Sequence, residues 1–254
     1  MKRWIWGVLG GIFLGAIVFF AEFRQTEKRC KGIIVKLDET AEYPFFTEKD
    51  IKDILTVKGV DEIEGMSFSK INLKGLEKRI LKSRLIKKCE VYRDLSGNLV
   101  VAIEQHRPVG RLIASTLEEG SFLSASQGGY LTETGEIVPL SQRFAARTVL
   151  VSGDFFEKNR NLKSAAGKKI ISFLINLRQN SFWKAQIAEV IVGEDGELTL
   201  IPQVGQHRID FGLPEDMDVK FKKLMVFYKT VLPLRGWEKY TRVSVKFKNQ
   251  IVCE

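Results

Sequence analysis

The N-terminal segment constrains this chain more than any other feature of its sequence. From Trp4 to Ala21 no side chain carries a charge, and this run approaches the roughly 20 apolar residues that a helix needs to cross a bilayer. Every backbone group in lipid must be hydrogen-bonded within the segment, so a helix is expected despite the glycines in the run. Trp4, Trp6 and Phe23 would lie near the membrane interfaces, where aromatic residues are favoured. We therefore expect a transmembrane anchor over residues 4–23.

Two other interpretations of this segment stay open. Lys2 and Arg3 form a short basic region ahead of the apolar run, as in a cleaved signal peptide. The run ends, however, in bulky residues from Val18 to Phe23, where a signal peptidase requires small ones. We favour an uncleaved anchor over a signal peptide, and both over a buried core helix.

The charges beside the anchor do not decide its orientation. Lys2 and Arg3 lie on one side, while Arg24, Lys28 and further basic residues lie on the other, so the positive-inside rule is split. A tail of residues 1–3 is easily left in the cytoplasm. The expected arrangement is then a linker over residues 24–31 and export of the remaining chain.

Composition excludes few partners by itself. The formal net charge is +9, and such an excess can attract nucleic acid or anionic lipid. No run of Lys and Arg with interleaved aromatic residues occurs, and an exported domain rarely meets nucleic acid, so we expect none as a partner. Cys30, Cys89 and Cys253 are an odd number, widely spaced and without a C-x-x-C pair. Unpaired thiols are expected, although an oxidising compartment would allow one disulfide.

The first part after the linker predicts a small α+β unit over residues 32–107. A β-branched run at 32–38 indicates a strand, and Thr47 with Asp50 has the spacing of a capping box that opens a helix. A second helix is expected after Asn72. Strands at 88–93 and 99–104 flank a turn-forming segment and predict a hairpin. The expected order is strand, helix, helix, strand, strand, with the helices on one face of a sheet.

Short strands dominate the remainder, which predicts a β-rich domain with interspersed helices over residues 108–254. Pro108 marks the boundary because proline cannot donate to a strand ladder. Helices are expected near Ala165–Asn180 and over about Val219–Val231, the second ending before Pro233. The final strands are expected at 240–247 and 249–253. The last of these would form an exposed sheet edge.

No constellation of catalytic residues emerges. The chain lacks a glycine-rich phosphate loop and a G-x-S-x-G elbow. His106 and His207 are far apart, without the spacing of a zinc site, and are expected at the surface or in a sheet. S-x-x-K occurs at Ser67 and at Ser181, but without the companion motifs of serine acyl-enzymes. The sequence predicts no enzyme, metal, cofactor or small-molecule substrate, and favours a binding or scaffolding protein.

Several segments, in order, resemble the FtsQ/DivIB family of cell-division proteins. Residues 45–51 resemble the opening of that family's first helix, and 72–76 with 86–93 resemble its second helix and following strand. Residues 97–109 are similar to the family passage L-x-I-x-V-x-x-R-x-P-V, and residues 130–140 to Y-x-D-x-x-G-x-x-x-P-L. Each motif alone is weak, and the specificity lies in their order.

The resemblance implies a POTRA domain followed by the family's β domain. It implies a scaffold in the divisome that links early and late division proteins and helps control septal peptidoglycan synthesis. The implied partners are FtsB-like and FtsL-like coiled-coil proteins and other divisome proteins. The implied location is the cell inner membrane at the division septum, with the N-terminus in the cytoplasm and the bulk in the periplasm.

In that family a partner adds a strand beside the last strands of the β domain, a sound physical means of recognition. Phe247 is the expected aromatic anchor, but alternation along a strand means that Phe247 and Lys248 cannot both face the partner. The alternative role for Phe247 is in the core. The corresponding positions here are Val243, Val245, Phe247, Lys248, Asn249, Gln250, Ile251 and Val252.

Two functions from other classes compete with the scaffold. A POTRA-bearing component of secretion or outer-membrane assembly would need a barrel or repeated POTRA units. A membrane-anchored envelope hydrolase should lose activity when Ser67 or Ser181 is changed.

Overall fold

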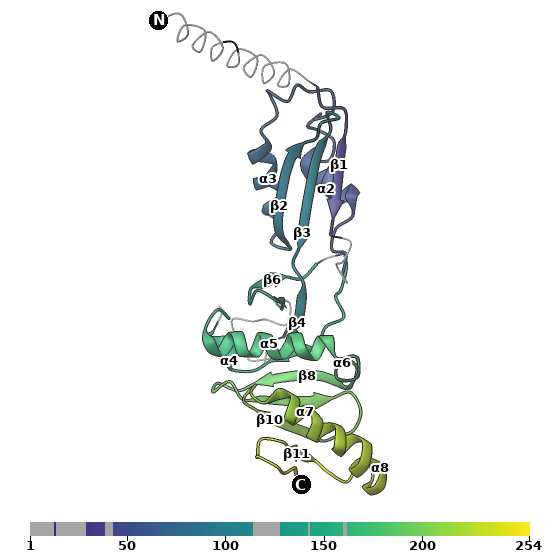
Figure 1. The fold of residues 1–254 in the computed structure, drawn as a ribbon, viewed down its shortest axis with the longest axis vertical. Coiled ribbons are helices and arrows are strands. Elements are labelled where there is room, and N and C mark those ends of the chain that lie inside the picture. The colour runs from purple at the N-terminus through teal and green to yellow at the C-terminus, as the bar shows by residue number, and fades with distance from the viewer. Residues whose placement is uncertain (1–12, 14–28, 39–42, 114–127, 142, 160–161) are drawn as a thin grey trace, which may run out of the picture. The chain divides into compact units, whose positions relative to one another are not determined.

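The computed structural model describes Phe13 and residues 29–38, 43–113, 128–141, 143–159 and 162–254 (Figure 1). Apart from Phe13, the anchor expected over residues 4–23 lies outside the described residues. Within the described part of the chain no helix is long and apolar enough to cross a membrane. The chain divides into two compact units, Met1–Gln105 and His106–Glu254.

The first unit combines a three-stranded sheet with two helices. Its elements are β1 (Ile33–Leu37), α2 (Glu48–Leu55), α3 (Leu73–Leu81), β2 (Ile86–Arg93) and β3 (Leu99–Gln105). The central β3 runs parallel to β1 and antiparallel to β2. This confirms the predicted order of strand, helix, helix, strand, strand.

Local hydrogen bonds define where the helices of the first unit begin. Thr47 Oγ1 accepts the Asp50 N–H at 3.3 Å, and the Asp50 carboxylate accepts the Thr47 N–H at 2.9 Å, so the predicted capping box forms. The Asn72 side chain accepts the Gly75 N–H at 2.9 Å and caps α3. The helices then bury Ile51, Leu55 and Ile80 completely against the sheet.

The second unit is built on one nine-stranded sheet. Its strands are β4 (Pro108–Leu112), β5 (Gly129–Thr132), β6 (Ile137–Pro139), β7 (Leu150–Ser152), β8 (Ile187–Val192), β9 (Leu198–Pro202), β10 (Arg208–Gly212), β11 (Arg242–Ser244) and β12 (Val252–Cys253). The order across the sheet is β12-β11-β10-β9-β8-β7-β4-β5-β6. The pairs β10–β11, β4–β7 and β7–β8 are parallel and the others antiparallel. The last strand of the chain therefore forms one edge of the sheet, as predicted.

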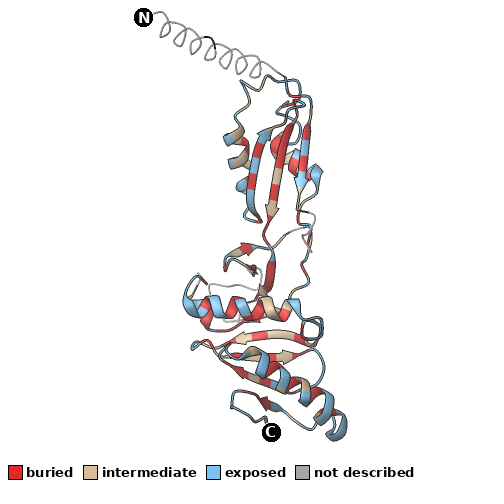
Figure 2. Cartoon of the chain, viewed as in Figure 1, coloured by how far each residue is buried: buried red, intermediate tan, exposed pale blue. Residues whose placement is uncertain are grey.

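Helices lie across one face of this sheet (Figure 1). They are α4 (Phe155–Lys158), α5 (Ala165–Gln179), α6 (Ser181–Gln186), α7 (Met217–Val226), the π-helical turn η1 (Phe227–Val231) and α8 (Leu232–Arg235). Buried and exposed residues alternate along α5 and α7 (Figure 2), which is the pattern of helices with one covered face.

Aromatic rings join the helices to the sheet. Phe221 of α7 lies 5.1 Å from Phe211 of β10 and 5.1 Å from Trp183 of α6, measured between ring centroids. Phe173 of α5 lies 5.0 Å from Phe211. Such ring pairs add to the stabilisation from area burial, so this cluster fixes α5, α6 and α7 on the sheet.

Three predicted elements near the C-terminus differ from the structure. The strand expected at 240–247 spans only Arg242–Ser244, and the one expected at 249–253 spans only Val252–Cys253, because the chain turns between them with Asn249 at φ +61°. The last helix does not end at Pro233. That residue lies in the first turn of α8, where a missing N–H is tolerated.

The histidines and cysteines are placed as follows. His106 and His207 were expected at the surface or in a sheet. Both are buried, with 8% and 1% of their surface exposed, and each lies directly beside a strand but not in it, His106 after β3 and His207 before β10. Cys30, Cys89 and Cys253 are free thiols, as predicted. Within the described ranges no group of three or more His, Cys, Asp or Glu side chains could hold a metal ion.

Gly167, in the first turn of α5, provides a test of this packing. A Cβ there would lie 2.6 Å from the Leu162 carbonyl oxygen and 2.7 Å from its Cα. Although alanine is the better helix former, Gly167→Ala should lower the free energy of unfolding by about 1–3 kcal/mol, because backbone must move. Urea denaturation followed by tryptophan fluorescence measures this, since Trp183 and Trp237 both lie in the second unit.

The exposed Ser172 of the same helix is the control. Ser172→Ala should leave the stability unchanged or raise it slightly. Equal stability of the two alanine variants would show that α5 does not approach Leu162 as described.

Candidate partner-binding site

The open edge of the nine-stranded sheet is the first feature of the candidate site. β12 pairs antiparallel with β11 through Val243 opposite Cys253 and Ser244 opposite Val252. The next pair, Arg242 and Glu254, exchanges two backbone hydrogen bonds of 3.2 and 2.9 Å. Hydrogen-bonded and non-hydrogen-bonded pairs alternate in an antiparallel ladder. The N–H and C=O of Cys253 therefore point away from β11, towards the open edge.

The structure separates the predicted contact residues into two groups. Val243 and Val245 have 0% of their surface exposed and belong to the core, so their side chains cannot contact a partner. Their role is to hold β11 in the sheet. The exposed members are Phe247, Lys248, Asn249 and Gln250, and the partly exposed members are Ile251 and Val252.

The exposed members lie in the loop between β11 and β12, not in a strand. Phe247 has 49% of its surface exposed, so the core role considered for it is not observed. Because the loop is not an extended strand, its side chains do not strictly alternate between two faces. The expectation that Phe247 and Lys248 cannot both face the partner therefore no longer applies. Gln250 lies before β12 in the chain. A strand added by a partner would therefore pair first with the backbone of Cys253.

Lys223 is part of the site and was not identified from the sequence. Its side chain extends from α7 to the loop, where Nζ donates to the carbonyl oxygens of Val245 at 2.8 Å and Phe247 at 2.7 Å. The Gln250 carbonyl oxygen lies 3.5 Å away. Only its position next to the buried stripe of α7 could have pointed to it.

A charged cluster at the start of β11 was also missed. Arg242 Nε donates to Asp210 Oδ2 at 2.6 Å, and its Nη1 lies 3.6 Å from Glu254 Oε2. The hydrogen bond to Asp210, with the attraction of both carboxylates, raises the pKa of Arg242. In β10, Arg208 is the register partner of Arg242. Asp210 therefore offsets the repulsion between two neighbouring arginines.

The thiol of Cys253 in the edge strand and the phenol of Tyr228 in η1 are held neutral by burial. Burial raises the pKa of Cys253, and it raises the pKa of Tyr228 to about 12. Tyr228 Oη lies 2.9 Å from His207 Nε2. Burial also lowers the pKa of His207, so this buried pair is neutral at pH 7.

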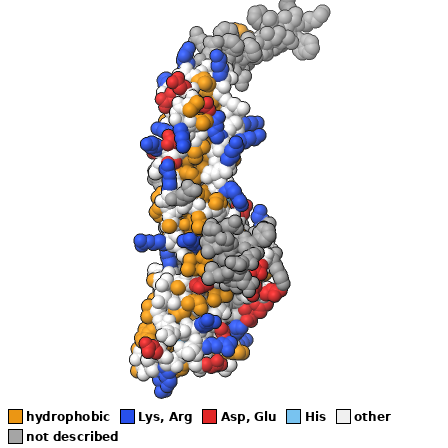
Figure 3. Space-filling model, turned by 180° about the vertical axis from the view of Figure 1, so that it is seen from behind, with side chains coloured by type: hydrophobic (Ala, Val, Ile, Leu, Met, Phe, Trp, Pro, Cys, Tyr) orange, Lys and Arg blue, Asp and Glu red, His pale blue; other side chains and the backbone are white. Residues whose placement is uncertain are grey.

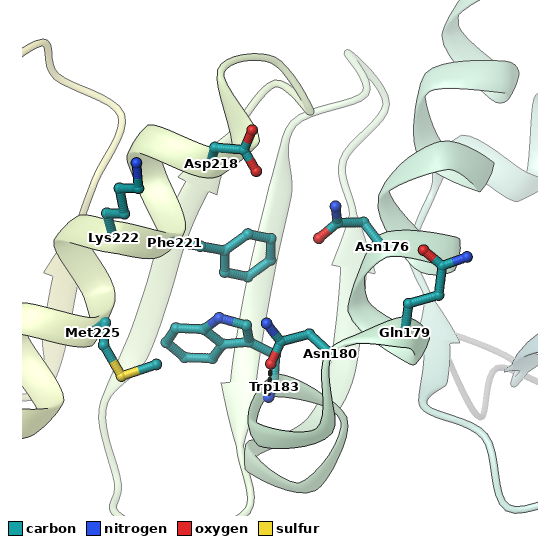
Figure 4. Close-up of a pocket in the computed structure, with 8 residues that line it drawn as sticks. All are labelled: Asn176, Gln179, Asn180, Trp183, Asp218, Phe221, Lys222 and Met225. Atoms are coloured by element: carbon teal, nitrogen blue, oxygen red, sulfur yellow. Dashed lines mark hydrogen bonds between the residues drawn. The ribbon is translucent and has the colours of Figure 1, made fainter.

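A shallow groove of about 480 Å³ lies between α5, α6 and α7 (Figure 4). It is lined by Asn176, Gln179, Asn180, Trp183, Asp218, Phe221, Lys222 and Met225. The Asn180 side chain accepts the N–H groups of Phe182 and Trp183, both at 3.1 Å, and so caps α6. The rings of Trp183 and Phe221 are 2% and 7% exposed, so their faces cannot stack on a ligand.

Charge is dispersed over the surface. Lys and Arg side chains are interspersed with Asp and Glu on the face drawn in Figure 3. The excess of positive charge is thus spread over this face and does not form one continuous basic patch there.

The fold and edge together define a class of protein: a POTRA-like module followed by a β domain whose last strand is open for pairing. Comparison with known families agrees. Residues 28–104 match the POTRA-like domain, and residues 122–254 match the family described as FtsQ/DivIB, C-terminal related. No curated protein matches the chain. Because the second match covers more than half of the chain, this protein belongs to the FtsQ/DivIB family, whose role is that of a cell-division scaffold.

The buried His207 gives the second unit a predictable pH dependence. Its pKa in the folded state lies below the ordinary value of 6.5, so the unfolded state binds the proton more readily. The contribution of His207 to the free energy of unfolding is therefore fully present above about pH 6.5. It is lost as the pH falls through the lower pKa of the folded state. Urea denaturation at a series of pH values between 7.5 and 5, roughly spanning the histidine range, measures this loss.

The chain has two histidines, which allows a matched comparison. His207→Gln should remove the loss of stability that His207 causes between about pH 6.5 and 5, whereas His106→Gln should retain that loss. If His106→Gln removes it instead, the dependence does not come from the His207–Tyr228 pair.

Proposed function

We propose that this protein is a non-enzymatic scaffold of the divisome that binds an FtsB–FtsL-type complex through the C-terminal edge of its β domain. It links early and late division proteins and helps control septal peptidoglycan synthesis. Family membership supports the scaffold role. The observation that carries the binding mode is the position of β12 at the edge of the sheet.

The physical basis of binding is strand addition. An edge strand leaves backbone donors and acceptors unpaired with protein, and an extended peptide can pair with them. Here the outward-facing groups belong to Cys253. β12 has only two residues, and a short edge strand limits unwanted pairing between copies. A partner must therefore gain further affinity from side chains beside the edge.

Phe247 is the proposed side-chain anchor. It is about half exposed in the folded chain, and burial of an aromatic ring is a frequent source of binding energy at interfaces. Lys248, Asn249 and Gln250 form the polar rim of the same loop. Ile251 and Val252, which are partly exposed, complete the surface.

We propose the following organisation for the whole chain. Residues 1–3 lie in the cytoplasm, residues 4–23 cross the inner membrane once, and residues 24–31 link the anchor to a POTRA domain at 32–107 and a β domain at 108–254. The folded units then lie in the periplasm, at the division septum. The support for this arrangement is the uncharged run from Trp4 to Ala21 together with the family.

Two substitutions at one position test the backbone pairing. Cys253→Pro removes the outward N–H without removing a bond to β11, and Cys253→Ala removes the side chain but keeps the N–H. We expect the proline variant to bind an FtsB–FtsL-type complex at least about tenfold more weakly, roughly the effect of one well-placed hydrogen bond. The alanine variant should bind nearly as tightly as the wild-type chain.

Isothermal titration of the folded variants gives both affinities. Amide exchange of Arg242 and Glu254 confirms that β11 and β12 remain paired. Equal affinity of the proline and alanine variants would exclude pairing through Cys253.

Localisation tests the wider role separately. A functional fluorescent fusion to the full chain should concentrate at the septum in dividing cells. Its even distribution over the envelope throughout division would contradict a divisome role, whatever the binding measurements show.

A further inference from the structure

Three backbone carbonyl oxygens of the loop between β11 and β12 face the ammonium group of Lys223. Lys223 Nζ lies 2.8 Å from the Val245 carbonyl oxygen, 2.7 Å from that of Phe247 and 3.5 Å from that of Gln250. An ammonium group has three protons to donate, and hydrogen bonds from a charged donor are stronger than neutral ones. One side chain of α7 thus contacts the beginning, the middle and the end of this loop.

The backbone that carries Lys223 is itself rigidly placed. Its neighbours Phe221 and Leu224 are buried in the core of the second unit, with 7% and 0% of their surface exposed. Val245, the first residue of the loop, is buried as well, and its N–H donates to the Asp210 carbonyl oxygen at 3.0 Å. The ammonium therefore connects the loop to a helix that is packed in the hydrophobic core of the second unit.

We propose that Lys223 is a positioning residue, which holds the β11–β12 loop in the conformation that presents Phe247 and β12 to the partner. This rests on the proposed function. β12 spans only Val252 and Cys253, and the Arg242–Glu254 pair extends the ladder beyond it. The ladder thus holds the chain after the loop, and the contacts of Lys223 hold the loop itself. A loop ordered before binding does not have to be ordered during it, and this strengthens the association.

Phe247 shows why side-chain placement depends on Lys223. Its carbonyl oxygen makes the shortest of the three contacts with Nζ, while its ring remains half exposed. Fixing the peptide group after Phe247 limits the directions in which the ring can point. The lysine thus controls the proposed anchor without touching the partner.

Lys222 provides a matched control within the same helix. It is exposed and lines the groove between α5, α6 and α7, on a different side of α7 from the loop. Among the contacts of the described residues, its ammonium has no hydrogen-bond or ion-pair partner. Lys222→Met and Lys223→Met therefore remove the same charge and the same number of atoms, but only the second removes the contacts with the loop.

The experiment compares these two variants of the full chain by amide hydrogen exchange and by titration with an FtsB–FtsL-type complex. Lys223→Met should accelerate exchange over residues 246–254 by about tenfold or more and weaken binding at least about fivefold. Lys222→Met should change neither. Lys223→Arg keeps the charge and several donors, so its exchange rates and its affinity should lie between those of the wild-type chain and of Lys223→Met. It replaces the methionine variant if that variant does not fold.

Each outcome decides one point. Unchanged exchange in Lys223→Met overturns the proposed role in the loop. Faster exchange with unchanged affinity shows that the order of the loop does not matter to the partner, and also overturns the proposal. If the wild-type chain does not bind the complex, the proposed function fails, while exchange still decides whether Lys223 orders the loop. Weakened binding in Lys222→Met would indicate that the groove or the overall charge, and not the loop, meets the partner.

Discussion

Burial of aromatic rings between helices and sheet is the interaction on which the second unit depends. Phe221 packs between Phe211 of the sheet and Trp183 of α6, and this contact fixes α7 against β10. Because α7 is fixed, Lys223 reaches the loop between β11 and β12. The hydrophobic packing of α7 thus determines where the Lys223 ammonium meets the exposed loop between β11 and β12.

The end of α7 shows how strongly this packing constrains the backbone. The helix continues through a π-helical turn at Phe227–Val231 before Leu232 begins α8. Phe227, Tyr228 and Leu232 are all buried. A wider turn changes the angle between successive side chains, so it allows two adjacent aromatic residues to face the core, where Tyr228 meets His207.

Sequence patterns predicted the elements whose signals are local. Thr47 and Asp50 form the expected capping box, and Asp94 with Asn98 forms the expected hairpin turn, where Asp94 Oδ1 accepts the Asn98 N–H at 2.7 Å. The order of elements in the first unit followed from such signals. The exposed edge at β12 followed from its place in the chain order.

The features that sequence reasoning missed depend on contacts between distant segments. The pattern over residues 240–247 predicted a longer strand, but β11 ends at Ser244, and after the buried Val245 the chain enters a loop in which Asn249 has φ +61°. A lysine in a charged helix is usually solvated, and nothing in the pattern distinguishes Lys223 from Lys222. Their difference arises only when α7 is seated on the sheet. His207 likewise gains a partner, Tyr228, that lies 21 residues further along the chain.

The open edge and the loop beside it have different physical roles. Backbone pairing with Cys253 is available to any extended peptide, because every residue except proline offers the same donor and acceptor. Pairing alone therefore cannot distinguish one partner from another. Discrimination must come from groups that vary in size and charge, and Phe247 and Lys248 are two of the exposed groups that the loop places beside β12. Since their positions depend on the loop and Lys223 contacts the loop, the proposed mode of binding links selectivity for the partner to a residue outside the proposed contact surface.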